Sequence, residues 1–296
     1  MSIVTLTPKA TAAHRTSPTF LVVDPHHFDV SYAINPWMRP EVWDAAPKRF
    51  KKASRDAFSG LTEALKAAGA HVEIMTGFPG APDLVFPANA GVVLDGRAVL
   101  SRFRHPQRQV EEAINRAGFE ALKARGLLSE VIQLESGYQE GAGDFIWDPT
   151  RSLFWAGFGP RSDAAGTEAL AQQFGKPTIR LELSTDRFYH LDTCFCVLSG
   201  GEILYYPPAF TADALDALRN TVAADQLIEA SDEDAARFCV NAVCIDRTII
   251  MAKAEDTLRG VLADRGYCLS EVDLAPFILS GGGAYCMTLR LDRTSS

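Results

Sequence analysis

The residues best suited to chemistry in this sequence are a cysteine after three glycines, a histidine and several carboxylates. Cys286 follows "GGGAY", His190 opens "HLDTCF", and Glu140 and Asp144 flank "GAG". A cysteine thiolate can attack an electrophilic carbon while a histidine protonates the leaving group and then activates water. The glycines before Cys286 let the backbone turn and approach a substrate closely. This combination predicts nucleophilic catalysis, provided that the fold brings the residues together.

Carboxylates near a cysteine indicate the charge of the substrate. An acyl substrate develops an oxyanion that needs N–H donors, whereas Glu140 and Asp192 would oppose that charge and raise the pKa of the thiol. A planar guanidinium instead pairs with a carboxylate through two hydrogen bonds, and its positive charge favours the thiolate. These residues therefore predict a cationic, guanidinium-like small molecule as the substrate.

A repeated pattern explains how residues so far apart in the chain could meet. Each unit has two short strands separated by a turn, then an amphipathic helix and a further strand, and the units recur roughly every 50 residues. Asp95-Gly96 is a typical hairpin turn of the first unit. The first residues of the units are near Asn89, Gly141, His190 and Asn241, and residues 281–291 open a fifth unit that stops early.

The parts missing from the fifth unit stand near the N-terminus, in "TFLVVDP", "RDAFSGLTEALKAAG" and "AHVEIMTG". A ring closed in this way removes open sheet edges and turns the first residues of all units toward one axis. We therefore expect one central site formed by Asn89, Glu140 to Asp144, His190 with Asp192, Asn241 and Cys286. An α/β sheet without symmetry is the alternative, but hairpins between the helices argue against plain β–α–β crossovers.

Composition and charge narrow the class of protein further. The 296 residues are 47% hydrophobic with a formal net charge of −8, which favours a globular chain and disfavours nucleic acid or an anionic membrane as a partner. No apolar run approaches a bilayer span and no secretory signal is recognisable, so we expect a cytoplasmic protein with reduced thiols. The six cysteines show no zinc-like spacing, and no motif demands a metal or cofactor. We expect a flexible tail at 1–18 and a single catalytic domain at 19–296.

Three motifs resemble those of a known superfamily. "EGAGD" (140–144), "FYHLDTCF" (188–195) and "GGGAYCMTLR" (281–290) are similar to motifs of the guanidino-modifying enzymes, which include arginine deiminases, dimethylarginine dimethylaminohydrolases and amidinotransferases. The resemblance extends from about Thr19 onward and implies an α/β fold, the five-bladed α/β-propeller (pentein) of pseudo-symmetric ββαβ units. It implies Cys286 as the nucleophile and His190 as general acid and base. It also implies Glu140 and Asp192 as guanidinium ligands, Glu140 as part of the catalytic set, and a covalent S-alkylthiouronium intermediate without a cofactor.

Further stretches resemble the arginine dihydrolase branch, which gives ornithine, ammonia and carbon dioxide. Asn89 in "FPANAG" stands where deiminases and dimethylarginine hydrolases carry an aspartate, and Asn35 in "INPWM" would lie beside the substrate. A neutral amide at position 89 can bind a neutral ureido intermediate and so allow a second attack. By position, Arg108 and Arg161 match arginines that bind the substrate α-carboxylate.

Other activities remain open at this point. The chain could be a deiminase giving citrulline, a dimethylarginine dimethylaminohydrolase releasing methylamines, or an amidinotransferase that needs a second amine. Tyr189 and Tyr285, each directly before a catalytic residue, are large and are expected to narrow or reshape the pocket. A ligand-binding protein with a decayed site is the non-enzymatic alternative, against which stands the intact set of Cys286, His190 and Glu140. A homo-oligomer is compatible with the sequence.

Overall fold

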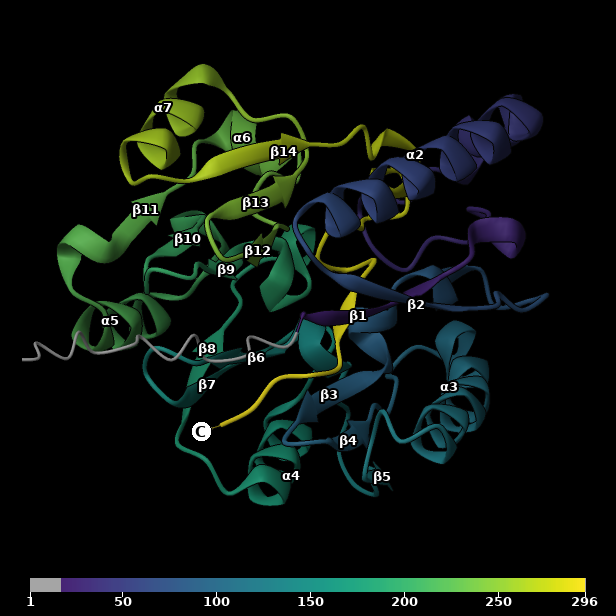
Figure 1. The fold of residues 1–296 in the computed structure, drawn as a ribbon, viewed down its shortest axis with the longest axis horizontal. Coiled ribbons are helices and arrows are strands. Elements are labelled where there is room, and N and C mark those ends of the chain that lie inside the picture. Colours follow the sequence, from purple (N-terminus) through teal and green to yellow (C-terminus); the bar gives the residue numbers. More distant parts are fainter. Residues whose placement is uncertain (1–16, 296) are drawn as a thin grey trace, which may run out of the picture.

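The computed structural model describes residues 17–295, which form a ring of small sheets with helices around it (Figure 1). In this part of the chain there are five three-stranded sheets, one for each predicted unit. The predicted five-bladed α/β-propeller is therefore confirmed. Its strands, blade by blade, are β3 (Gly91–Leu94), β4 (Arg97–Leu100) and β5 (Glu130–Gln133); β6 (Phe145–Asp148), β7 (Leu153–Phe158) and β8 (Thr178–Glu182); β9 (Phe195–Val197), β10 (Ile203–Tyr205) and β11 (Leu227–Glu229); β12 (Val243–Ile245), β13 (Thr248–Met251) and β14 (Cys268–Glu271); and β15 (Leu289–Arg290), β1 (Thr19–Val23) and β2 (His71–Met75).

Every blade has the same pairing. Its first two strands form an antiparallel pair, and its third strand runs parallel to the second. In the first blade Val92 pairs with Val99, which pairs in turn with Ile132. Asp95 and Gly96 turn this hairpin with φ of 54° and 73°, the left-handed backbone that a two-residue turn of this kind requires.

One helix connects the second and third strands of each blade and lies on the outside of the ring (Figure 1). In α2, Leu61 and Leu65 are four residues apart and fully buried, which is the spacing of one helix face. A proline begins α2 and α3, where its missing N–H costs no helical hydrogen bond. These helices are α2 (Pro47–Ala67), α3 (Pro106–Ala124), α4 (Ala164–Phe174), α5 (Ala212–Thr221) and α7 (Asp256–Asp264); α1 (Pro40–Ala45), α6 (Asp232–Ala236) and α8 (Ala275–Ile278) are short additions.

Neighbouring blades are held together by shared apolar clusters. Val92 and Val99 of the first blade pack in one cluster with Phe145, Phe154 and Leu170 of the second. The rings of Phe145 and Phe154 lie 4.4 Å apart between centroids. Because each cluster contains residues of two blades, the blades fix one another's orientation and hence the geometry at the axis.

The split blade closes the ring as the sequence predicts. Phe20 pairs with Arg290 and Leu21 with Leu289, so β15 joins β1 from the other end of the chain (Figure 1). The backbone N–H of Thr19 donates to Asp292 Oδ1 at 2.8 Å.

Two expectations differ from the structure or lie beyond it. The third strand of the third blade, β11 at Leu227–Glu229, was not located in the sequence, because its two apolar residues are adjacent and stand between polar residues, without alternation. The predicted tail at 1–18 lies mostly outside the described residues, and β1 begins at Thr19. The single domain at 19–296 stays a prediction.

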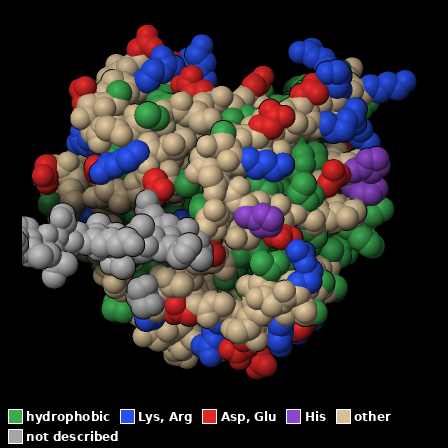
Figure 2. Space-filling view, viewed as in Figure 1, with side chains coloured by type: hydrophobic (Ala, Val, Ile, Leu, Met, Phe, Trp, Pro, Cys, Tyr) green, Lys and Arg blue, Asp and Glu red, His purple; other side chains and the backbone are tan. Residues whose placement is uncertain are grey.

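Figure 2 shows Lys and Arg side chains interspersed with those of Asp and Glu on the face in view. Among residues 17–295, none of the helices has the length and apolar character needed to cross a membrane.

Candidate active site

The residues predicted to face the axis lie where the first strand of each blade begins. Short 3₁₀ turns at Pro87–Ala90, Gly141–Gly143 and Leu191–Thr193 precede three of these strands. The structure thus brings to one end of the axis Asn89 before β3, Glu140 and Asp144 before β6, His190 and Asp192 before β9, Asn241 before β12 and Cys286 before β15.

Hydrogen bonds between blades connect these segments directly. Asn89 Nδ2 donates to the backbone oxygen of Glu140 at 3.2 Å, and the N–H of Ala88 donates to the backbone oxygen of Cys286 at 3.2 Å. Gly143 allows this approach, because a Cβ there would lie 2.4 Å from Asn89 Nδ2 and 3.6 Å from the His190 ring. Gly143 is therefore needed for the close packing of Asn89 against His190.

Cys286 is buried, with 2% of its surface exposed, and is held on both sides. Its Sγ lies 3.1 Å from Asp192 Oδ2 and accepts a hydrogen bond from Asn241 Nδ2 at 3.1 Å. Asn241 Oδ1 accepts from the backbone N–H of Cys286, also at 3.1 Å. Burial, with the neighbouring Asp192, raises the pKa of the Cys286 thiol well above its ordinary value. In this structure the group is a thiol donating to Asp192.

Asp192 carries a buried oxygen that has no hydrogen-bond partner among the described residues. Burial raises the pKa of its carboxyl to about 7, although the hydrogen bonds from Cys286 and Asn241 oppose that rise. Oδ2 faces Cys286, whereas Oδ1 is buried without a hydrogen-bond partner. An orphaned buried acceptor is costly and rare, and it marks the place where a donor is missing.

His190, Glu140 and Arg161 form a second buried group. His190 Nε2 and Arg161 Nη1 both lie within hydrogen-bond distance of Glu140 Oε2, at 2.8 and 2.9 Å. Burial would raise the pKa of Glu140, but Arg161 and the hydrogen bond from His190 hold it well below its usual range. Glu140 is therefore ionised, and it orients the His190 ring.

Asp144 has a supporting position. Its Oδ1 accepts from the backbone N–H of Leu191 and its Oδ2 from Ser162 Oγ, at 2.8 and 2.6 Å. Its Oδ2 is 4.0 Å from His190 Nε2, and burial raises the pKa of its carboxyl to about 6. With both oxygens engaged, Asp144 fixes the turn that carries His190.

Arg108 is more enclosed than its expected role in carboxylate binding implies. Its Nε and Nη2 donate to the two oxygens of Glu111 at 2.8 Å each, and its other donors reach Asn89 Oδ1 and the backbone oxygen of Asp83. Burial raises the pKa of Glu111 to about 7. Sequence reasoning missed Glu111, although its position three residues after Arg108 on a helix was an available signal.

Asn35 lies in a segment that covers the site. Asn35 Nδ2 donates to the backbone oxygen of Ser280 at 3.1 Å, and Arg161 Nη2 donates to that of Ile34 at 3.2 Å. The Tyr189 hydroxyl donates to the backbone oxygen of Gly281 at 2.5 Å. The segment at 34–38 is thus tied by hydrogen bonds to Arg161 and to the loop before Cys286.

Within the described part of the chain, no group of three or more His, Cys, Asp or Glu side chains is arranged to hold a metal ion. The six cysteines are free thiols, and Cys268 is the exposed one among them.

Comparison with known proteins places this geometry in a family. A family model described as N,N dimethylarginine dimethylhydrolase, eukaryotic, matches residues 25–293. The chain is 40% identical over 277 residues, 92% of its length, to the bifunctional arginine dihydrolase/ornithine cyclodeaminase AgrE of Nostoc sp.. It spans 37% of the length of that relative. It is also 31% identical over 281 residues to the N(G),N(G)-dimethylarginine dimethylaminohydrolase of Mycobacterium tuberculosis, covering 94% of this chain and 88% of that one.

Solved structures agree with the sequence comparison. The substrate-bound N-terminal domain of a variant of ArgZ, a cyanobacterial arginine dihydrolase, superposes with a TM-score of 0.86 and 36% identity, over 95% of this chain and 100% of that one. Another structure of that domain, covalently bonded to a reaction intermediate, gives the same TM-score over 94% of this chain and 99% of that one. Since the family model spans nearly all of the described blades, the chain belongs to the dimethylarginine dimethylaminohydrolase family of guanidino-modifying enzymes.

Proposed function

We propose that this chain is a cysteine-dependent hydrolase that cleaves the guanidino C–N bonds of L-arginine and acts as an arginine dihydrolase. The observation that carries the proposal is the orphaned Oδ1 of Asp192, next to an Oδ2 that lies 3.1 Å from Cys286 Sγ. A guanidinium N–H satisfies that oxygen and brings its carbon beside the sulfur. The similarity to AgrE over 92% of the chain supports arginine as the substrate.

The first half of the reaction starts from a thiol. The bound guanidinium brings a positive charge that opposes the effect of burial on the pKa of Cys286. Sγ bonds to the guanidino carbon, a C–N bond breaks, and the thiol proton leaves on ammonia by way of His190. Glu140 holds the His190 ring at 2.8 Å for that transfer. The product of this half is the S-alkylthiouronium.

The second half consumes water. His190 deprotonates a water molecule that attacks the thiouronium carbon, which frees the thiol and leaves a neutral ureido group. A second attack by Cys286 expels a second ammonia, and a second water then releases carbon dioxide and ornithine. Arginine and two waters thus give ornithine, two ammonia and carbon dioxide.

Asn89 is the residue suited to retain the neutral intermediate. Its Oδ1 accepts from Arg108 and one N–H of its Nδ2 is committed to Glu140, so one N–H remains for a ureido oxygen. A carboxylate at this place would prefer a cation and would let the ureido compound leave.

The α-carboxylate of the substrate fits Arg161 better than Arg108 in this conformation. Arg161 uses two of its donors, on Glu140 and Ile34, whereas Arg108 makes four hydrogen bonds. Asn35 lies beside Ile34 and contributes by holding the cover in place. Because catalysis needs a reduced Cys286, we place the enzyme in the cytoplasm.

A methylarginine hydrolase is the second candidate. The observation that favours it is the match of the dimethylarginine hydrolase family model to residues 25–293, together with a relative of that activity matched over 88% of its length. In that reaction a methylamine would leave instead of ammonia and citrulline would be the product.

Mass spectrometry of the products decides between these functions. Purified protein is incubated separately with L-arginine and with asymmetric dimethylarginine, alongside Cys286→Ala and Asn89→Asp. Ornithine with two ammonia per arginine, lost in Cys286→Ala and shifted toward citrulline in Asn89→Asp, supports the dihydrolase. Citrulline as the sole product of arginine makes the protein a deiminase, and methylamine from dimethylarginine alone supports the second candidate.

A further inference from the structure

A cavity of about 40 Å³ lies on the propeller axis, within the ring. Some of its lining residues are sequence neighbours of the catalytic residues. The first strands of all five blades contribute to its wall, which places it at the centre of the ring. Ala142, Ala242 and Tyr285 also line it, and each is one residue or two from a residue of the candidate active site. The cavity has room for about three waters or one small ion.

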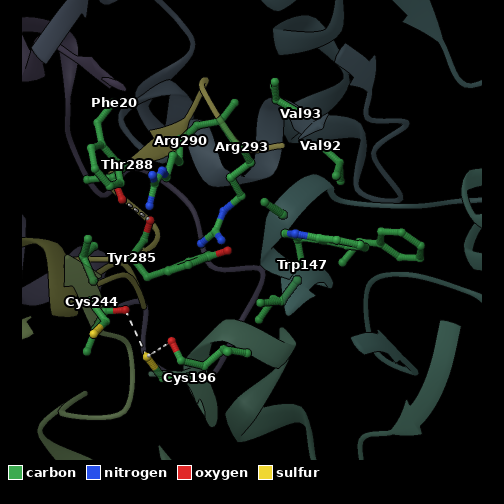
Figure 3. A pocket seen from close by; sticks show the side chains of 17 residues that line it. Phe20, Val92, Val93, Trp147, Cys196, Cys244, Tyr285, Thr288, Arg290 and Arg293 are labelled. Atoms are coloured by element: carbon green, nitrogen blue, oxygen red, sulfur yellow. Dashed lines mark hydrogen bonds between the residues drawn. The ribbon is translucent and has the colours of Figure 1, made fainter. Parts of the chain in front are cut away.

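The wall of this cavity offers hydrogen-bond donors and lacks carboxylates. Trp147 is 3% exposed, and its Nε1 is buried without an acceptor. Figure 3 shows this nitrogen on the side of the indole that faces Tyr285 and Arg293. Among the described residues, neither the Tyr285 hydroxyl nor the Arg293 guanidinium makes a hydrogen bond, and no Asp or Glu lines the cavity.

Of the two arginines in the cavity wall, one has an acidic partner and the other does not. Arg290 donates to both oxygens of Asp292 at 3.1 Å, so its charge is paired. Arg293 has no ion pair among residues 17–295, and burial lowers the pKa of its guanidinium. Arg293 is of intermediate exposure as a whole residue, but its guanidinium faces the cavity without an anionic partner, and a bound anion would supply that partner.

We propose that this axial cavity binds a small monoanion, such as a halide or formate, between the Arg293 guanidinium, the Trp147 indole N–H and the Tyr285 hydroxyl. The guanidinium, the indole N–H and the hydroxyl are hydrogen-bond donors without acceptors among the described residues. They surround a cavity whose volume fits one small ion. The site is separate from the substrate site and needs no part of the proposed reaction.

Thermal unfolding in increasing sodium bromide and sodium formate tests the proposal. The parent midpoint rises and saturates with anion concentration. Arg293→Gln abolishes the saturable rise, and Trp147→Phe weakens the apparent affinity by about tenfold, as expected for one lost hydrogen bond to a charged group. Arg180→Gln, which removes an exposed arginine of β8 without a recorded ion pair, responds like the parent.

Crystals of the parent soaked in bromide give a second, independent readout. An anomalous peak between Arg293 and Trp147 is expected. Absence of that peak overturns the proposal, and so does an equal rise in the midpoints of the parent and Arg293→Gln, because that rise would be a general salt effect. The crystallographic result stands even if Arg293→Gln fails to fold.

Discussion

The two ends of the propeller axis differ in their carboxylates. At the catalytic end, Glu140, Asp144 and Asp192 are buried around His190 and Cys286. At the cavity end, Arg293, Trp147 and Tyr285 present donors, and no carboxylate lines the wall among the described residues. The same five first strands connect both ends. The side chains just before these strands form the catalytic end, and those along the strands form the cavity end. The charge of each end therefore depends on the side chains and is not determined by the fold alone.

Each end leaves one buried polar atom without a partner. It is an acceptor at the catalytic end, Asp192 Oδ1, and a donor at the cavity end, Trp147 Nε1. Since native proteins satisfy nearly all such atoms, the type of orphan indicates the kind of partner that is missing: a hydrogen-bond donor for the first and an acceptor for the second, which fits the proposed guanidinium and the proposed anion.

The strongest test of the catalytic end is to remove the sulfur. Cys286→Ala should lower turnover by about 10⁴-fold or more, because no other group there can form the covalent bond. Substrate should still bind, since Asp192 is unchanged, and titration calorimetry measures this. Cys268→Ala, at the exposed thiol, is the matched control. Turnover retained in Cys286→Ala would make the cysteine structural.

The proton-transfer group comes next in expected effect. His190→Asn should reduce kcat by about 10²- to 10⁴-fold, as for other general acid–base residues. His71→Asn, an exposed histidine of β2, should leave kcat unchanged. Steady-state kinetics with both variants separates the effect from loss of folded protein, and equal kcat values would remove His190 from the mechanism.

The raised pKa of Asp192 makes stability depend on pH at the catalytic end. With a native pKa of about 7 and an unfolded value near 4, the native state binds more protons between about pH 4 and pH 7. This contribution is complete below about pH 4 and is lost as the pH rises through about 7, at most about 4 kcal/mol.

Urea unfolding across that pH range measures the contribution. The free energy of unfolding of the parent should fall more steeply with pH than that of Asp192→Asn. Asp213→Asn, an exposed carboxyl of α5, should follow the parent. Parallel curves for the parent and Asp192→Asn would show that the pKa of this carboxyl is the same in the native and unfolded states.

The smallest effect is expected from the amide that holds the sulfur. Asn241→Ala removes the 3.1 Å hydrogen bond to Cys286 Sγ, which should raise the apparent pKa of alkylation of Cys286 by about one to two units. Iodoacetamide labelling of the peptide that contains Cys286, followed by mass spectrometry over pH, gives this value. Asn220→Ala, at the exposed end of α5, is the control. An unchanged alkylation profile would mean that the amide only positions the backbone.

Much of the fold could be predicted because its signals are local and repeated. The Asp95-Gly96 turn and five similar units led to the ring, and the split unit followed from what was missing at residues 281–291. The three-residue β11 carried too little pattern to be found. Strands of the same length, such as β9 and β10, were found because a glycine-containing turn connects them into a hairpin, a signal that β11 lacks.

The sequence predicted which residues form the site better than it predicted the contacts between them. Asn241 was expected at the axis, but its bonds to both Sγ and N–H of Cys286 depend on distances that only the assembled blades define. Tyr285 was expected at the substrate pocket, yet its ring lines the axial cavity (Figure 3). In the turn at 283–287, where the Met287 N–H bonds to Gly283, successive side chains diverge by about 100°, so neighbours in sequence face different spaces.

The pairing of β15 with β1 also bears on the order in which the molecule becomes active. During synthesis β1 and β2 emerge early, but the strand that completes their blade is made after all the others, and the bond from Thr19 to Asp292 spans 273 positions. Contacts of such separation carry a large loop-closure entropy cost. The same late segment delivers Cys286 to Asn241 and Asp192, so a partly folded ring has no assembled nucleophile, and closure of the ring and the onset of reactivity are one event.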